Sequence, residues 1–332
     1  MECSVITTYR CNAGCHMCNC WQYPSKSSEE FKPAILEKLP SQISRLNITG
    51  GEPAMREDLA EIVAVLDKRT KDLEISTNGY FTERLIKVAQ EFPRVTFRMS
   101  VEGLPKLNDR LRGIDDGFDH ALRTLLELKE LGVKNIGFAI VISHNNIHDL
   151  ISLYELAAGL GVEFAQATMH NSFYFHKTDN KVENLELVSK IMQDFMKRLL
   201  TSKRHPLRMR VKDWFRAYIN MGFLRYIEGK ARTIPCSAAT DFFFVDPWGK
   251  ILACNGSEEP WIMGDLNTQD FDEIWASDQA KKVRELVRNC DRNCWMTGSA
   301  VPAMRNRIWV PIWWVLKNKT RLMMGKQDIL LD

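Results

Sequence analysis

The chain has no uncharged apolar run long enough to span a membrane, and its N-terminus lacks the apolar core of a secretion signal. We therefore expect it to stay in the cytoplasm, where thiols are kept reduced. Net charge is also small, at +3 over 332 residues, so nothing in the total charge indicates binding to nucleic acid. Internal repeats and low-complexity segments are absent. These absences leave an ordinary globular protein, large enough for one α/β domain and a smaller appendage.

Cysteine, by contrast, is abundant, with nine residues in the chain. In a reducing compartment, clustered cysteines indicate metal binding or catalysis before disulfides. Seven of the nine fall into two groups, which are Cys11, Cys15 and Cys18 near the N-terminus and Cys236, Cys254, Cys290 and Cys294 late in the chain. We expect Cys3 and Cys20 to be bystanders, because an unligated cysteine commonly serves as a small buried hydrophobe.

The first two-thirds of the chain alternates short β-rich runs with amphipathic helical patterns. Residues 56–69, for example, place Leu59, Ile62 and Leu66 on one helical face, and the pattern at 118–131 meets Gly132, a residue suited to ending a helix. The expected strands cover residues 4–9, 46–49, 73–76, 95–101, 136–142 and 162–168. Six β-then-α units predict a parallel sheet, either open and doubly wound or a partial barrel. Either form brings ligands to the C-terminal strand ends.

The pattern changes after the sixth unit. A long helical stretch comes first, followed by a β-hairpin whose turn is Asp246-Pro247-Trp248-Gly249 and by a helix at 270–287. We therefore divide the chain into a core at 1–180, a helical bridge at 181–232, a small hairpin-and-helix domain at 233–300 and an aromatic, basic tail at 301–332.

The first three cysteines form a C-x₃-C-x₂-C pattern directly after the first expected strand. Three thiolates on one tight loop can reach three corners of a cuboid [4Fe–4S] cluster and leave one iron open to a cofactor or substrate. A zinc site completed by His16 or Cys20, or buried cysteines without a ligand, are the alternatives. Zinc fits poorly, since its ligands usually come as pairs separated by a longer loop.

This spacing resembles the signature of the radical SAM superfamily, and further family-like motifs follow at strand ends in the family's order. They are Gly50-Gly51-Glu52-Pro53, Ser76-Thr77-Asn78-Gly79, Ser100-Val101-Glu102-Gly103 and Arg112-Gly113. The resemblance covers about residues 1–170. It implies a partial (β/α)6 TIM-like barrel and an enzyme that uses S-adenosylmethionine (SAM). In such enzymes an electron from the reduced cluster cleaves SAM, and the resulting 5′-deoxyadenosyl radical abstracts a hydrogen atom from the substrate. The electron comes from a donor such as flavodoxin or ferredoxin.

The same resemblance implies which residues contact SAM. They are Met17, Gly50, Gly51, Glu52, Pro53, Ser76, Asn78, Ser100, Glu102 and Arg112. Two of them depart from the family pattern, since Met17 stands where an aromatic residue is common and Glu102 replaces the usual aspartate. Neither departure blocks the chemistry, but both leave the detailed contacts of these two side chains open.

The late cysteines have a spacing of their own. Cys236 and Cys254 frame a C-x₁₂-G-x₄-C pattern across the hairpin, and Cys290 and Cys294 close the set. Four thiolates suit either a structural zinc or a fully ligated [4Fe–4S] cluster. The pattern resembles the start of a SPASM domain, and four cysteines resemble its shortened twitch form with a single auxiliary [4Fe–4S] cluster. The closing C-x₃-C departs from the C-x₂-C of some twitch enzymes, so Cys290 is the least secure ligand.

Two further segments give weaker signals. His170, Asn171 and Tyr174 follow the sixth strand, where they could bind or protonate a substrate or could be ordinary loop polars. The tail combines tryptophans with cations, which is typical of a helix lying on a membrane surface. A tail that covers the barrel mouth or forms a dimer contact is the alternative, favoured because Pro311 interrupts a single long helix.

Three functions follow from these patterns. The first is a radical SAM oxidoreductase that dehydrogenates a small polar molecule such as a sugar, an aminocyclitol or a conjugate, with the auxiliary cluster accepting an electron. The short segment before Cys11 favours it, since it leaves no room there for a leader-binding domain. The second is a maturase of peptides or proteins with the same cofactors. The third is a zinc-binding scaffold without enzymatic activity, which leaves the strand-end motifs unexplained.

Overall fold

The computed structural model describes all of residues 1–332 and contains one nine-stranded sheet, ordered β6-β5-β4-β3-β2-β1-β7-β8-β9. The strands are β1 Glu2–Ile6, β2 Arg45–Thr49, β3 Leu73–Thr77, β4 Thr96–Ser100, β5 Ile136–Ile142, β6 Glu163–Thr168, β7 Phe242–Val245, β8 Lys250–Leu252 and β9 Ile262–Asp265. The helices are α1 Leu59–Asp67, α2 Thr82–Glu91, α3 Pro105–Arg112, α4 Gly117–Glu130, α5 Leu150–Gly159, α6 Leu185–Leu200, α7 Leu207–Ile227, α8 Phe271–Ala276, α9 Asp278–Arg288, α10 Thr297–Asn306 and α11 Trp309–Met323.

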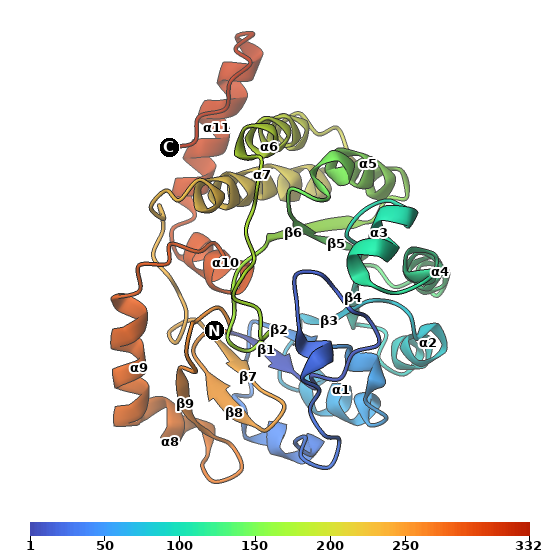
Figure 1. The fold of residues 1–332 in the computed structure, drawn as a ribbon, viewed down its shortest axis with the longest axis vertical. Coiled ribbons are helices and arrows are strands. Elements are labelled where there is room, and N and C mark those ends of the chain that lie inside the picture. Colours follow the sequence, from blue (N-terminus) through green and yellow to red (C-terminus); the bar gives the residue numbers. More distant parts are fainter.

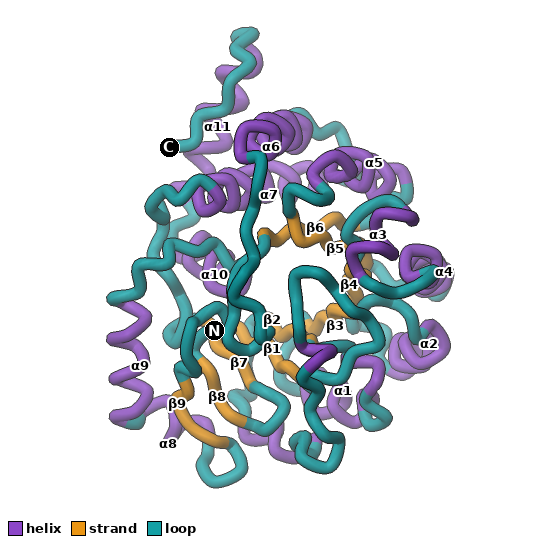
Figure 2. Tube along the Cα trace, viewed as in Figure 1, coloured by secondary structure: helices purple, strands orange, loops and turns teal.

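The strands β1 to β6 form a partial barrel. Each is parallel to its neighbour, and their spatial order is their chain order, without the reversal that defines a doubly wound sheet. Figures 1 and 2 show these strands as an arc with α1, α2, α4 and α5 on its outer side. Residues such as Val5, Ile48 and Phe97 are fully buried, as expected for strands covered on both faces. The predicted α/β partial barrel is confirmed.

The hairpin of the second cysteine group continues this same sheet. β7 pairs in parallel with β1, so that Cys3 lies opposite Phe243 and Val5 opposite Val245. We expected this hairpin to belong to a small domain at 233–300; that it joins the barrel sheet, and that a third strand β9 follows it, was not predicted. The hairpin joins the barrel sheet because all four residues of β7 are buried, and such a short apolar strand needs a partner strand on each side. The edge of the barrel supplies one partner and β8 the other.

The helix expected at 270–287 is two helices, α8 and α9, separated at Ser277. Asp270 and Glu273 form a capping box at the start of α8. The Ser277 hydroxyl accepts a hydrogen bond from the backbone N–H of Ala280 at 3.1 Å and begins α9. Hydroxyl and carboxylate caps therefore override the continuous apolar periodicity of this segment.

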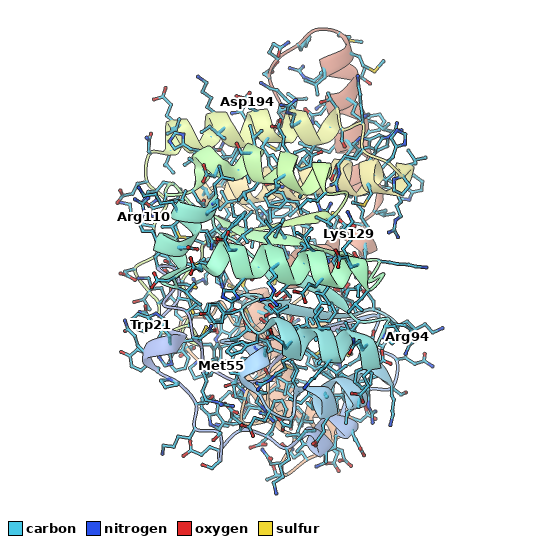
Figure 3. The ribbon with its side chains drawn as sticks, turned by 90° about the vertical axis from the view of Figure 1, so that its right-hand side faces the viewer. Trp21, Met55, Arg94, Arg110, Lys129 and Asp194 are labelled. Carbon is cyan, nitrogen blue, oxygen red and sulfur yellow. The ribbon has the colours of Figure 1, made fainter.

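The strand ends define a functional side of the barrel. In Figure 3, Trp21 and Arg110 lie at one edge of the molecule, whereas Arg94 and Lys129 lie at the opposite edge. Arg94 precedes β4 and Lys129 ends α4, so the second edge is the N-terminal side of the strands. None of the helices combines the length and the apolarity that crossing a bilayer requires.

Candidate active site

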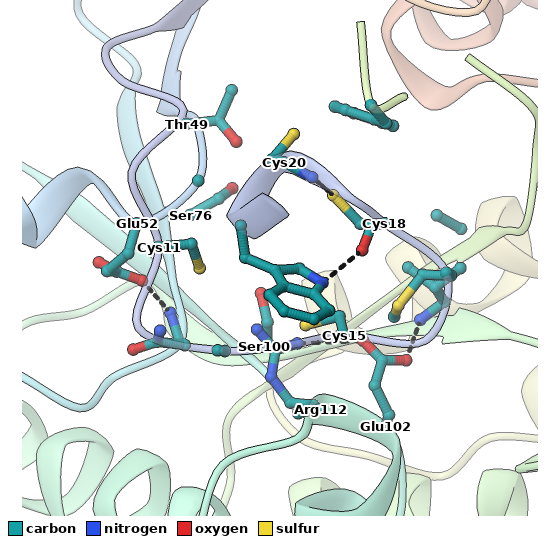
Figure 4. A pocket seen from close by; sticks show the side chains of 18 of the residues that line it. Cys11, Cys15, Cys18, Cys20, Thr49, Glu52, Ser76, Ser100, Glu102 and Arg112 are labelled. Carbon is teal, nitrogen blue, oxygen red and sulfur yellow. Dashed lines mark hydrogen bonds and ion pairs between the residues drawn. The ribbon is translucent and has the colours of Figure 1, made fainter. Parts of the chain in front are cut away.

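An open cleft with about 930 Å³ of empty space lies at the C-terminal ends of the barrel strands. Figure 4 shows its side chains, which come from the loops after several strands. The residues predicted from sequence that line it are Cys11, Cys15, Met17, Cys18, Gly50, Gly51, Glu52, Ser76, Asn78, Ser100, Glu102, Arg112 and His170. The fold thus gathers residues that are far apart in the chain at one edge of the barrel, as expected for parallel strands.

The loop of the first three cysteines is held against the end of α3. His16 donates its backbone N–H to the carbonyl of Leu111 at 2.9 Å. Gly113 adopts a left-handed conformation, with φ of 56°, and a Cβ there would lie 2.7 Å from the carbonyl oxygen of Gly14. Glycine at 113 is therefore required twice, for its backbone angle and for close approach to the cysteine loop. This packing gives a structural reason for the Arg112-Gly113 pair.

Cys11, Cys15 and Cys18 all line the cleft. Burial raises the pKa of Cys11 to about 12 and also raises that of Cys15, because a thiolate is poorly solvated there. No three potential ligand side chains in the chain converge closely enough to hold a single metal ion. The neighbouring Cys20 also lines the cleft, and its thiol donates to the carbonyl of Tyr174 at 3.7 Å.

The diglycine after β2 permits close packing of the cleft floor. A Cβ on Gly50 would lie 2.5 Å from the carbonyl oxygen of Thr8, and one on Gly51 would collide with the carbonyl of Arg10. Arg10 immediately precedes Cys11. The two glycines therefore allow the loop after β2 to lie directly under the cysteine loop.

Glu52 is fully buried and organises the neighbouring strand ends. Its carboxylate accepts hydrogen bonds from the backbone N–H groups of Ala54 at 2.9 Å and Asn78 at 2.7 Å, and from the Thr77 hydroxyl at 2.7 Å. Burial raises its pKa, although these donors act in the opposite direction. Glu52 thus fixes the loop of Ser76 and Asn78 besides facing the cleft.

Glu102 and Arg112 form a buried ion pair on the other side of the cleft, at 3.1 Å. Glu102 also accepts the backbone N–H of Val141 at 2.9 Å. Desolvation raises the pKa of Glu102 to about 7, despite the charge of Arg112. The Nε atom of Arg112 is buried without a partner, so part of this guanidinium remains available to a ligand.

Of the remaining residues predicted to contact SAM, some line the cleft and others pack behind its walls. The hydroxyl of Ser76 donates to Asn47 at 3.0 Å, and the amide of Asn78 donates to Asn12 at 2.7 Å. Pro53 is buried in the short helix behind Glu52 and does not line the cleft. Met17 lines the cleft.

Three of the four late cysteines line a separate cavity. Cys236, Cys290 and Cys294 line it, together with Arg232 and other residues. Cys254 is half-buried and does not line this cavity, and desolvation raises the pKa of its thiol. Its sulfur also accepts the backbone N–H of Gly256 at 3.2 Å. The structure thus places three of the four late cysteines, including Cys290, around one cavity.

Comparison with known proteins identifies both halves of this arrangement. Residues 5–157 match the model of the radical SAM superfamily. This part of the chain is therefore a radical SAM domain. Residues 236–295 match SPASM, an iron–sulfur cluster-binding domain, so the chain carries a SPASM domain after its barrel.

Relatives match different lengths of this chain. Fe-coproporphyrin III synthase of Methanosarcina barkeri is 32% identical over 45% of the chain, and the match spans 39% of that protein. The sporulation killing factor maturation protein SkfB of Bacillus subtilis is 22% identical over 87% of the chain and 68% of its own length. The structure of Streptococcus suis SuiB bound to S-adenosylmethionine superposes with a TM-score of 0.64, at 16% identity, over 86% of the chain and 68% of SuiB. That structural likeness shows a common fold.

A radical SAM domain uses a [4Fe–4S] cluster and SAM, and a SPASM domain carries auxiliary iron–sulfur clusters. The cleft fits the first two groups. It offers three thiols for a cluster that leaves one iron open, and it contains buried polar atoms without partners, namely Arg112 Nε, Thr168 Oγ1 and His170 Nε2. Such atoms are costly to leave unpaired, and a polar ligand such as SAM supplies partners for them.

Residues 169–184, between β6 and α6, form a strap that connects this cleft with the SPASM domain. Asn180 donates to the carbonyls of Met17 and His170, both at 3.0 Å. Arg292 of the SPASM domain donates to the carbonyl of Asn171 at 3.1 Å. The strap therefore bonds to the cysteine loop at one end and to the auxiliary region at the other.

The three substrate-loop candidates lie at different places on this strap. His170 lines the cleft, and burial lowers its pKa to about 4, so its imidazole is neutral at neutral pH. Tyr174 packs instead in an apolar cluster with Tyr9 and Phe244, away from the cleft. The Asn171 side chain accepts the backbone N–H of Asn180 at 2.8 Å, which stabilises the strap itself.

Sequence reasoning missed several residues of the cleft. Trp21, Phe175 and Asn180 line it, but none lies in a motif or at a predicted strand end. Their role depends on how the strap folds back over the cysteine loop. No local pattern carries that information, because the contacts join residues more than 150 positions apart.

Proposed function

We propose that this radical SAM enzyme modifies a side chain or backbone position of a peptide or protein. The observation that supports the proposal most is the match to SkfB, a maturation protein, which runs through both the barrel and the SPASM domain. Mycofactocin maturase MftC of Mycolicibacterium smegmatis is 30% identical over 46% of the chain. This proposal reverses our order of preference from sequence, in which a small polar substrate came first.

Within this proposal, Cys11, Cys15 and Cys18 hold the SAM-binding cluster, and Cys236, Cys254, Cys290 and Cys294 hold an auxiliary [4Fe–4S] cluster. The bound cluster and SAM supply the 5′-deoxyadenosyl radical that abstracts hydrogen from the substrate. The protein's part is to hold the substrate C–H bond in reach and to exclude water from it.

The cleft residues would orient SAM by charge and hydrogen bonding. Glu52 and the loop of Ser76 and Asn78 provide acceptors and donors for the charged methionine end. Arg112 offers its unpaired Nε–H, and its pairing with Glu102 holds the guanidinium in place. Because Glu102 is longer than the usual aspartate, it reaches Arg112 directly, and we propose that its role is to position that arginine.

The substrate would lie between the two cluster sites, beside His170. A Cβ on Gly256 would lie 3.5 Å from the His170 ring and 3.7 Å from the Cys254 sulfur, so the ring approaches the auxiliary site. A neutral imidazole there can accept a proton when a substrate position is oxidised. The auxiliary cluster would accept the accompanying electron, as we expected for a small substrate.

A small-molecule substrate is the second candidate, and the match to Fe-coproporphyrin III synthase favours it. A zinc-binding scaffold without enzymatic activity would give no reason for the diglycine packing or for the buried Glu102–Arg112 pair.

The test is substrate-dependent formation of 5′-deoxyadenosine by anaerobically reconstituted enzyme with SAM and dithionite. Two pools would be compared at equal mass, a set of synthetic peptides covering all residue types and a set of sugars, aminocyclitols and conjugates. We expect the peptide pool alone to raise the rate above the uncoupled background and to give peptide mass changes. His170→Ala should lose the stimulated rate and keep the background rate. Stimulation by the small-molecule pool and not by peptides would overturn the proposal.

A further inference from the structure

The C-terminal helix α11 has two opposite apolar faces. The first is buried against α7 and α6 and includes Trp314, which is 4% exposed and donates its indole N–H to the carbonyl of Leu330 at 2.8 Å. Pro311 lies in the first turn of α11, where proline is tolerated, and α10 ends before it. This face is sufficient to attach α11 to the body of the molecule.

The second face has no partner in the chain. Trp309 is 77% exposed, Trp313 72% and Leu316 53%, and Met323 continues the row at 85%. These residues recur at the spacing of one helical face, opposite to that of Trp314. Figure 1 shows α11 extending beyond α6 and α7 at one end of the molecule, so this face is open.

Cations surround the exposed row, without acidic residues among them. Residues 305–326 contain six arginines and lysines and no aspartate or glutamate, in a chain whose net charge is only +3. Arg305 and Arg321 pair with Glu2 and Asp328. The exposed Arg307, Lys317 and Lys326 have no such partner.

We propose that α11 docks on the surface of an anionic lipid bilayer. Trp309, Trp313 and Leu316 would enter the headgroup region, because an indole has an apolar body and a polar N–H suited to that depth. The free cations would meet lipid phosphates. Nothing from the tail lines the active-site cleft, so docking leaves that cleft open. This inference does not depend on the proposed substrate.

A second copy of the chain fits the exposed row less well. Pairing two such faces would bring the same cations of both copies together, and like charges across an interface oppose association. An anionic bilayer satisfies both the apolar row and the charges around it.

The test uses the full-length reconstituted enzyme and vesicles of phosphatidylcholine, alone or mixed equally with phosphatidylglycerol. We expect cosedimentation with the mixed vesicles only, a blue shift of tryptophan emission, and weakening at high salt. The double variant Trp309→Ser/Trp313→Ser should reduce vesicle binding at least tenfold. Arg307→Glu/Lys317→Glu should also reduce it at least tenfold, because each cation near the surface contributes about fivefold to binding.

Matched controls change the same chemistry elsewhere. Leu286→Ser removes an exposed apolar side chain from α9, and Lys134→Glu/Lys282→Glu makes the same charge change away from the tail. Both should bind as the wild type does, and all variants should retain the wild-type urea midpoint because the altered side chains are exposed. Equal binding by tail and control variants would overturn the proposal. So would a wild-type protein that stays in solution, or a tail variant whose only change is a halved mass in light scattering, which would identify a dimer contact.

Discussion

At the scale of single residues, the cleft depends on positions where a side chain has no room. Gly51 lies against the carbonyl of Arg10, directly before the first cysteine, and Gly113 lies against Gly14 within the cysteine loop. The motifs that identify the family are therefore packing requirements in this structure as well as ligand contacts. Replacing such a glycine should move the cysteine loop before it affects SAM directly.

The first prediction concerns Gly51→Ala. Because the added methyl group collides with backbone, we expect unfolding free energy to fall by about 1–3 kcal/mol, with reduced iron retention at the first cluster site. The control is Gly159→Ala, at the end of α5, where a Cβ would meet no atom within 4 Å. It should be neutral or slightly stabilising. Urea unfolding and iron assay measure both, and equal midpoints for the two variants would contradict the packing argument.

Adjacent tryptophans provide the second prediction. Trp314 is buried, whereas Trp313 is exposed. Trp314→Ala should lower unfolding free energy by about 3–5 kcal/mol because it leaves a cavity beside α7. Trp313→Ala should change it by no more than about 0.5 kcal/mol, since a surface side chain is removed. Thermal unfolding of the two variants measures the difference, and a Trp313→Ala protein as unstable as Trp314→Ala would show that the exposed face is packed after all.

At the scale of elements, a charged cluster joins the barrel to the helical bridge. Glu163 at the start of β6 pairs with Lys212 of α7 at 2.6 Å and also with Arg216. Burial by itself raises the pKa of Glu163, but the charge of Arg216 and the bond from Lys212 outweigh it and lower the pKa to about 2. The segment expected to be only a bridge is therefore fixed to the barrel by ion pairs.

The third prediction is the acid dependence of this attachment. A carboxyl group with a lowered pKa stabilises the fold above its unfolded value of 4.5, and the contribution is lost as pH falls from there toward 2. We expect unfolding free energy to drop by about 1 kcal/mol from this group between pH 6 and pH 3.5. Glu163→Gln should be less stable at pH 7 by roughly 2–3 kcal/mol. Its unfolding free energy should also fall less than that of the wild type between pH 6 and pH 3.5.

Urea unfolding of metal-free protein at several pH values tests it, because acid release of iron then does not contribute. The control is Glu155→Gln, whose carboxylate pairs with Arg198 at an exposed position. The unfolding free energy of this variant should fall with decreasing pH as much as that of the wild type. Parallel pH profiles for the wild type and Glu163→Gln would show that the pair with α7 contributes nothing.

At the scale of the whole molecule, one continuous sheet relates the two groups of cysteines. Cys11 follows β1 and Cys254 follows β8, and β7 joins these strands. The barrel and the SPASM domain therefore share strands, and the strap after β6 connects the two sites above the sheet. This arrangement fixes the position of the auxiliary site relative to the cleft.

The fourth prediction is that the two sites load independently. The wild type should hold about eight irons, and Cys11→Ala/Cys15→Ala/Cys18→Ala about four, with no SAM cleavage. Cys236→Ala/Cys254→Ala should also hold about four but still cleave SAM in the absence of substrate. Iron and sulfide assays with measurement of 5′-deoxyadenosine test both. Zinc in place of iron, or loss of all iron from either variant, would contradict two independent clusters.

The sequence by itself determined the cofactors and the barrel, and it predicts the ligands of the first cluster, because each depends on local signals. Spacing within eight residues specifies the thiols, alternation of apolar runs specifies the strands, and short motifs mark the strand ends. Only the tertiary structure decided that the hairpin joins β1, that Tyr174 turns away from the cleft while His170 faces it, and that α11 leaves its second face open. These features are contacts between distant segments, and their free energy depends on which surfaces meet in the folded chain, which no local pattern specifies.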